Sequence, residues 1–360
     1  MELTRRDVVR SWLLGSGCLF AMPSLAEDNT VGKPVVFAEK IHPKSDITDL
    51  LDDALEECSK KRLGAVVLPA GEYYAKSIKL RHNTKLIGMG ASSTRLIARS
   101  RSEASAFLTI DEGPVVRSGA KGLSLIGGTN AKPFNPGQWA FHAEARPEPG
   151  AKLAHGGLWQ SLFEDIEIRG FSQGVHLDGG GSSTLLPNQF LSFREFFVFL
   201  TPEPTGPSMK VTGQSAQTIF QQCQFDCQGS RSPYPTVEIG PSERSGRVAP
   251  AVLRFEVCTF QNARYGALLK NTQNVSFETC WFEQLDGGVE VGEGCSAVTI
   301  EGCRFANAGN IDPAVSFAPG TQGAVRSNVF AGKETRVSRR FGAKADVVDE
   351  NNSFFWGAGK

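Results

Sequence analysis

The sequence has no net charge and no hydrophobic run long enough to cross a membrane. Its 38 lysines and arginines balance 38 aspartates and glutamates, so no basic surface argues for a nucleic-acid partner. The apolar run at residues 12–22 is too short for a membrane helix, which needs about 20 residues. We therefore expect neither a nucleic-acid partner nor a membrane span.

Tyrosine is scarce, whereas phenylalanine and glycine are abundant. The chain has 4 tyrosines against 24 phenylalanines, and 39 glycines among its 360 residues. Hydrophobic residues make up 40% of the chain and charged residues 21%, which is typical of a globular protein rather than a disordered one. This composition favours a turn-rich fold whose aromatic side chains point mostly inward.

The first 26 residues carry the pattern of a targeting segment. Arg5 and Arg6 precede the apolar run, and the small residues that end at Ala26 follow it. This pattern resembles a twin-arginine export signal, which implies a periplasmic or secreted protein with cleavage after Ala26. We set residues 1–26 aside as the signal and residues 27–44 as a leader.

A short frame of Cys-x-Phe returns four times in the second half of the chain. Matching apolar frames extend the series in both directions, in steps of 22 to 35 residues. A second short apolar strand follows each frame, as in VHL (175–177), VEI (237–239) and VEV (289–291). Repeats of this length with short strands and no helix predict an all-β fold, a right-handed parallel β-helix.

The residues before this repeat predict a helix at its amino-terminal end. Apolar residues recur with helical spacing over residues 46–61, and Ser45 or Asp46 offers an acceptor for the first free amides. With GAVVLPAGEYY and KLIGMGASSTRL, this segment resembles the capping helix and first coils of the pectate-lyase-like β-helix superfamily. We expect a β-helix domain over residues 45–345, an insertion at 129–158 and a tail at 346–360.

The resemblance implies a polysaccharide as the partner, but the motifs that identify particular enzymes of the superfamily are absent. The sequence lacks the Asn-Thr-Asp and Gly-His-Gly motifs of polygalacturonases, the Asp-Pro-His of alginate epimerases and the Arg-x-Pro-x-x-Arg of pectate lyases. Its five histidines are scattered without the spacing of a metal site. No cofactor is evident, calcium has no motif to support it, and both a monomer and a trimer stay open.

Strand parity nevertheless ranks candidate catalytic residues. Alternate residues of a strand face opposite sides, so one row of side chains should point outward from adjacent coils. The predicted catalytic row is His176, Lys210, Glu238 and Glu290. The predicted substrate-binding residues, taken from the surrounding loops, are Arg231, Tyr234, Arg244, Trp139 and Trp159.

Two kinds of enzyme and one kind of binding protein fit this row. In a lyase acting on a uronate-containing glycan, cationic groups neutralise the sugar carboxylate and a base removes the adjacent proton. In a glycoside hydrolase, two carboxyl groups such as Glu238 and Glu290 flank the scissile bond. We expect a lyase ahead of a hydrolase or an epimerase, with a non-catalytic polysaccharide-binding or structural protein of the cell envelope as the alternative.

The repeated cysteines are expected to fill space. Equivalent positions of other coils hold Ile166, Phe196 and Asn328, so the position selects for volume rather than for thiol chemistry. We therefore predict a stacked ladder of buried thiols, without a redox or metal-binding role.

Overall fold

The computed structural model describes eleven stretches of the chain. They are residues 35–36, 44–62, 64–100, 102–129, 131–146, 156–181, 187–228, 232–243, 248–306, 313–332 and 339–356. All of them lie in one compact unit, Gly32–Lys360. The predicted export signal and most of the predicted leader lie outside these stretches, as do Arg231 and Arg244. No helix in the described stretches has the length and apolar character to cross a membrane.

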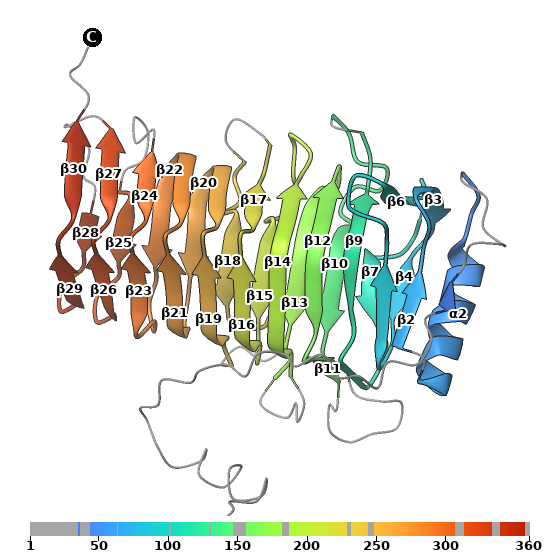
Figure 1. Ribbon diagram of the computed structural model, residues 1–360. Helices are drawn as coiled ribbons and strands as arrows, with labels where there is room; N and C mark the ends of the chain where they lie inside the picture. The colour runs from blue at the N-terminus through green and yellow to red at the C-terminus, as the bar shows by residue number, and fades with distance from the viewer. Residues whose placement is uncertain are drawn as a thin grey trace, which may run out of the picture. The chain divides into compact units, whose positions relative to one another are not determined.

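The strands stack in parallel ladders that form three faces (Figure 1). Face A contains β1 (Val35–Val36), β2 (Gly64–Val67), β5 (Thr84–Ile87), the first halves of β9 (Gly119–Ile126), β12 (Leu162–Arg169) and β14 (Gln189–Phe199), then β16 (Ala216–Gln221), β19 (Ala251–Glu256), β21 (Gln273–Glu278), β23 (Val298–Glu301), β26 (Gln322–Arg326) and β29 (Asp346–Glu350). Two short strands, β8 (Pro114–Val116) and β11 (Gly157–Trp159), pair beside its early coils.

The other two faces repeat the arrangement. Face B contains β3 (Gly71–Ala75), β6 (Thr94–Ala98), the second halves of β9, β12 and β14, then β17 (Gln224–Asp226), the first halves of β20 (Thr259–Leu269) and β22 (Trp281–Val291), β24 (Arg304–Ala306), β27 (Val329–Gly332) and β30 (Ser353–Trp356). Face C contains β4 (Ile78–Leu80), β7 (Ala106–Ile110), β10 (Trp139–Glu144), β13 (Gln173–Asp178), β15 (Met209–Thr212), β18 (Val237–Gly240), the last parts of β20 and β22, β25 (Val315–Phe317) and β28 (Arg339–Phe341).

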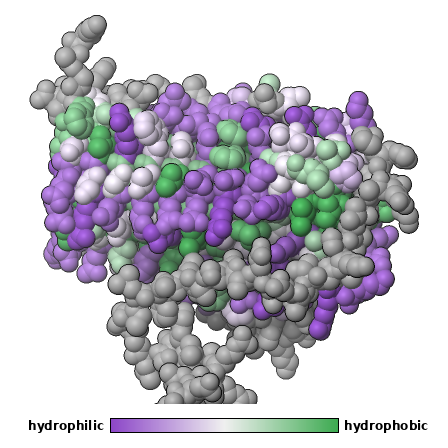
Figure 2. All heavy atoms as spheres, viewed as in Figure 1, coloured by the Kyte–Doolittle hydropathy of each residue, from purple (hydrophilic) through white to green (hydrophobic). Residues whose placement is uncertain are grey.

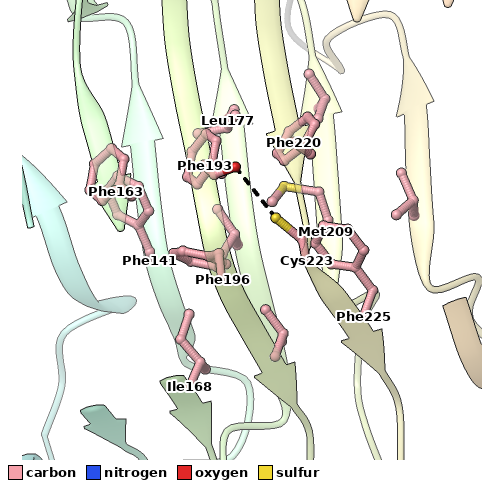
Figure 3. Close-up of a cluster of buried hydrophobic side chains, with 14 of the residues drawn as sticks. Phe141, Phe163, Ile168, Leu177, Phe193, Phe196, Met209, Phe220, Cys223 and Phe225 are labelled. Atoms are coloured by element: carbon pink, nitrogen blue, oxygen red, sulfur yellow. Dashed lines mark hydrogen bonds between the residues drawn. The ribbon is translucent and has the colours of Figure 1, made fainter. Parts of the chain in front are cut away.

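Stacked phenylalanine rings fill the interior. Phe163, Phe193 and Phe220 lie in one row, with successive ring centroids 5.0 Å apart (Figure 3). A second row continues through Phe282 and Phe305 at 4.7 Å. These rings are at most 1% exposed, so each coil buries its aromatic face against the next. The predicted register of the repeat is therefore confirmed.

The Cys-x-Phe frame forms the corner between faces A and B. The residue before each ladder position has a left-handed backbone, with φ of 54° at Gln222 and Val257 and 55° at Thr279. This conformation turns the chain from face A to face B within one residue, and the next side chain then points inward. Cys223 follows it and donates its S–H to the Phe193 carbonyl at 3.5 Å (Figure 3).

The ladder changes from cysteine to asparagine without changing its geometry. Cys303 donates to the Phe277 carbonyl at 3.3 Å, and Asn328 donates from Nδ2 to the Ile300 carbonyl at 2.9 Å. The side chains therefore satisfy the carbonyls of the preceding coil as well as filling space. The described cysteines are all buried free thiols, namely Cys58, Cys223, Cys227, Cys258, Cys280, Cys295 and Cys303.

A helix covers the first coil. α2 (Thr48–Lys61) buries Leu51 and Leu55, which are 1% and 0% exposed, against that coil. It begins two residues later than predicted, because Asp46 accepts hydrogen bonds from the Thr48 amide and hydroxyl instead of lying within the helix. Ion pairs from Arg81 to Asp52 (2.8 Å) and to Asp111 (3.0 Å) join the helix to the strands.

Two predicted boundaries differ from the structure. The predicted insertion at 129–158 contains a regular face-C strand, β10. The insertion is therefore two shorter segments on either side of a strand rather than one long loop. The predicted tail at 346–360 contains β29 and β30, which pair in register with β26 and β27 and add a further coil.

Candidate functional site

The four predicted catalytic residues lie in one outward row on face C. His176 pairs in register with Lys210, and Lys210 pairs with Glu238. Leu268 separates Glu238 from Glu290, so these two carboxylates are two strands apart. We call this line, which starts at His142 of β10 and ends at Glu290, the face-C row.

Three rings gather at the amino-terminal end of the row. The imidazoles of His142 and His176 are stacked, with centroids 4.7 Å apart and an interplanar angle of 2°. The indole of Trp139 lies 5.0 Å from the His176 ring. The Nε2 atom of His176 lies 2.9 Å from the Thr212 hydroxyl, which holds the imidazole in place. The structure thus brings Trp139, a predicted substrate-binding residue, to a predicted catalytic residue.

Lys210 is held as a cation in the middle of the row. Its ammonium donates to Glu243 at 2.9 Å and lies 3.6 Å from Glu238, and its side chain is only 16% exposed. Burial lowers the pKa of Lys210, but the hydrogen bond and charge of Glu243 and the charge of Glu238 outweigh it and raise the pKa above 10.5. The same pairing lowers the pKa of Glu243 below its ordinary value of 4.5.

These shifts define the pH range of the ion pair. A lowered carboxyl pKa means that the pair is lost only when the pH falls through that lowered value, and a raised lysine pKa means that it is lost only above about pH 10.5. Lys210 is therefore charged throughout the neutral range. It cannot accept a proton there, and it is already paired with Glu243 and Glu238.

Two buried carboxylates lie beside the histidines and were missed from the sequence. Glu144 and Asp178 pair in register and are 5% and 6% exposed. Arg146 donates to Glu144 at 2.7 Å, and the Gly180 amide donates to Asp178 at 3.0 Å. Each lies two residues after a histidine of the row, so strand parity was a signal that could have placed both on its face.

The remaining predicted binding residues are less closely tied to the row. Tyr234 is half-buried in the loop before β18, where its amide donates to the Ser232 hydroxyl at 3.2 Å. Trp159 lies at the start of face A, where its indole N–H donates to Gln189 at 3.0 Å and its ring lies 5.7 Å from Phe190. Their roles stay predictions.

Metal ligation and enclosed cavities do not single out this row. Within the described stretches, no group of three or more histidine, cysteine, aspartate or glutamate side chains is placed to hold a metal ion. Two surface hollows lie elsewhere, one near Arg99 and Phe134 and one near Val257 at the corner of faces A and B. The four predicted side chains of the row are half-buried, so each of them reaches the surface.

The comparisons with known proteins agree in fold alone. No protein family model matches the sequence, and no curated protein matches it either. The A-module of mannuronan C-5 epimerase AlgE6 from Azotobacter vinelandii superposes with a TM-score of 0.55 at 14% identity, over 88% of this chain and 96% of that one. Tailspike protein gp49 of Acinetobacter baumannii bacteriophage Fri1, a capsular polysaccharide depolymerase, gives 0.53 at 13% identity, over 91% of this chain and 62% of that one.

A third solved structure is similar over most of the chain. The Agl-KA catalytic domain gives a TM-score of 0.62 at 10% identity, over 90% of this chain and 68% of that one. Together with the three stacked faces, these likenesses establish the architecture. The chain is a right-handed parallel β-helix.

Proposed function

We propose that the chain is an exported enzyme that acts on a polysaccharide at the face-C row, by β-elimination on a uronate-containing glycan. The observation that carries this proposal is the juxtaposition of His176 with the charged ammonium of Lys210 on adjacent strands. The fold likeness to polysaccharide-active proteins supports the substrate class. The twin-arginine pattern of residues 1–26 supports export to the periplasm or beyond it.

Each residue has a stated role in this reaction. The Lys210 ammonium exchanges its contact with the exposed Glu243 for one with the substrate carboxylate, which acidifies the hydrogen on the adjacent ring carbon. His176, oriented by Thr212, accepts that proton. The electron pair forms a carbon–carbon double bond while the bond to the glycosidic oxygen breaks, and the leaving oxygen takes up a proton from water. Trp139 supplies an apolar surface beside the reacting ring.

A hydrolase is the second candidate, because the strands that carry two carboxylates of the row are separated by a distance close to the upper limit for inverting glycosidases. Glu238 and Glu290 are two strands apart, about 9.6 Å at about 4.8 Å per strand. Inverting glycosidases place their carboxyl groups about 6.5–9.5 Å apart. Leu268 would lie beneath the scissile bond in this arrangement.

Product analysis on a panel of uronate and neutral polysaccharides tests both candidates. We expect products that absorb as unsaturated uronates, and His176→Asn should lower kcat by about 10²–10⁴-fold. Lys210→Met should raise KM and also lower kcat, because the cation that binds the substrate carboxylate and acidifies the adjacent hydrogen is lost. His82→Asn and Lys85→Met change exposed residues outside the row and should leave both constants unchanged.

The alternatives give different results in the same assay. New reducing ends without unsaturated products, lost in Glu238→Gln and Glu290→Gln but kept in the exposed control Glu301→Gln, would replace the lyase by the hydrolase. A change in uronate stereochemistry without chain cleavage would indicate an epimerase. Binding without any product across the panel would overturn the enzyme and leave a non-catalytic binding protein.

A further inference from the structure

The outward surface of face B is apolar near the capping helix. Tyr74, Ile97 and Ile126 pair in register on adjacent strands and point outward, yet all three are half-buried. Further along the same row the chain places Arg169, as expected for an outward position. Figure 2 shows pale and green residues gathered over the strands of this part of the molecule. Outward positions of a strand are normally polar, so an apolar strip at these positions indicates that something packs on it.

A hollow of about 370 Å³ opens at one end of this strip. Its walls include Lys44, Asp46, Tyr74, Arg99, Ser100 and Phe134. Pockets for small molecules begin at about 300 Å³ and combine apolar walls with a few polar groups. The hollow is therefore large enough for one sugar ring.

Hydrogen bonds fix the backbone beside Phe134, whose side chain is 38% exposed. Its amide donates to the Gly127 carbonyl at 2.7 Å. The next residue, Asn135, is 8% exposed and donates to the Arg99 carbonyl at 2.8 Å, while it accepts from the Ser102 amide at 3.0 Å. The backbone that carries Phe134 is thus fixed before any ligand arrives, which reduces the entropy cost of binding.

The charged groups of the hollow leave an excess of one positive charge. Asp46 pairs with Arg99 and also accepts two hydrogen bonds from Thr48, so both of its oxygens are occupied. Lys44 is exposed, and its backbone amide is fixed to the Glu72 carbonyl at 2.6 Å. An anionic group entering the hollow therefore meets the Lys44 ammonium and the outer edge of the Arg99 guanidinium.

We propose that this hollow is a binding site for a uronic acid unit of a glycan. The sugar ring packs between Tyr74 and Phe134, and its carboxylate forms a charge-assisted contact with Lys44. This binding is a property of the hollow itself. Its use as an anchor for the chain that reacts at the face-C row rests on the proposed function. Phe134 and Trp139 are five residues apart, so their Cα atoms are at most about 18 Å apart and one glycan chain can reach both.

Calorimetric titration with D-glucuronate and with its methyl ester tests the site. We expect the wild-type protein to bind the acid about tenfold more tightly than the ester, because the ester lacks the charge. Lys44→Met should remove that preference, and Phe134→Ala should weaken both ligands. Arg95→Met, which changes an exposed cation on the same face, is the matched control and should bind both ligands as the wild type does.

Each outcome either supports or overturns the site. No binding of glucuronate to the wild-type protein, or binding that Lys44→Met and Phe134→Ala both leave unchanged, overturns it. Circular dichroism confirms that the variants are folded, since both side chains lie at the surface. The wild-type protein separates the two proposals: glucuronate binding without activity on any polymer of the panel would support the hollow and refute the enzyme. If both proposals hold, His176→Asn should lose activity on the polymer and keep glucuronate binding.

Discussion

Val257 adopts a backbone conformation that valine rarely occupies. Its φ is 54°, in the left-handed region, and its side chain is 55% exposed at the corner between faces A and B. Equivalent corners hold Gly302 and Asn351, which tolerate this region better, and also the β-branched Thr279. Left-handed geometry costs an L-residue about 1–2 kcal/mol, and a β-branched side chain is the least suited to it. The corner geometry therefore comes from the coil rather than from the residue.

Replacing this valine should stabilise the protein. We expect Val257→Asn to raise the free energy of unfolding by about 1 kcal/mol, because asparagine enters the left-handed region at lower cost. Denaturant titration followed by circular dichroism measures the change. Val348→Asn is the control, because Val348 is similarly exposed (43%) but lies in the extended strand β29, where asparagine is disfavoured. Equal effects of the two substitutions would contradict the explanation from backbone strain.

At the scale of the element, the ladder depends on hydrogen bonding as well as on volume. The Cys303 amide donates to Asn328 Oδ1 at 2.8 Å, and the Cys280 amide donates to the Cys303 sulfur at 3.4 Å. Sulfur is a weak acceptor, so the cysteine segment satisfies the same backbone groups less well than the asparagine segment does. Burial raises the pKa of the Cys303 thiol, which keeps it protonated and able to donate.

Extending the asparagine segment by one position tests this account. In Cys303→Asn, the amide oxygen would accept from Cys280 and the amide nitrogen would donate to Phe277. We expect unchanged or higher stability, by up to about 1 kcal/mol. Cys303→Val keeps an apolar side chain but leaves these two backbone groups unsatisfied, which should cost about 1–3 kcal/mol. If the Cys303→Val variant unfolded at a higher temperature than the Cys303→Asn variant, the ladder side chains would contribute by filling space and not by hydrogen bonding.

The repeated elements were predictable because each of their signals occurs many times. The Cys-x-Phe frame defines the inward positions of several coils, and parity then places His176 and Lys210 outward in register. The last coil was missed although Asn352 and Phe354 repeat the frame of Asn328 and Phe330. That frame lacks the cysteine, and the prediction stopped before reaching it.

Contacts made by single loops were not predictable. The ion pair between Lys210 and Glu243 depends on how one turn after β18 folds back over face C. This turn is not repeated in the other coils, so the repeat pattern does not predict its path. The closeness of Trp139 to His176 depends on β10 being a strand inside what the sequence presented as one long insertion. Strand parity alone would have found Glu144 and Asp178, because each lies two residues after an outward-facing histidine of the same strand.

For the whole molecule, the first coil needs a cover. A stack of strands exposes unpaired backbone groups and apolar side chains at its end, which invites aggregation. α2 covers this end with the buried side chains of Leu51, Ala54 and Leu55. Arg81, whose side chain is 14% exposed, ties the helix to the strands through Asp52 and Asp111. Because each coil contacts only its neighbours, the cap should stabilise the first coils more than the distant ones.

Leu55→Ala tests this locality. Leu55 is fully buried, so its truncation should lower the stability of the amino-terminal coils by about 2–5 kcal/mol. Hydrogen exchange should show faster exchange in β2 and β5, with protection in β21 and β23 unchanged. Asp53→Ala changes an exposed residue of the same helix and should leave exchange unaltered throughout. A uniform loss of protection along the stack would mean that the coils unfold as one cooperative unit, because truncation at one end would then destabilise strands it never touches.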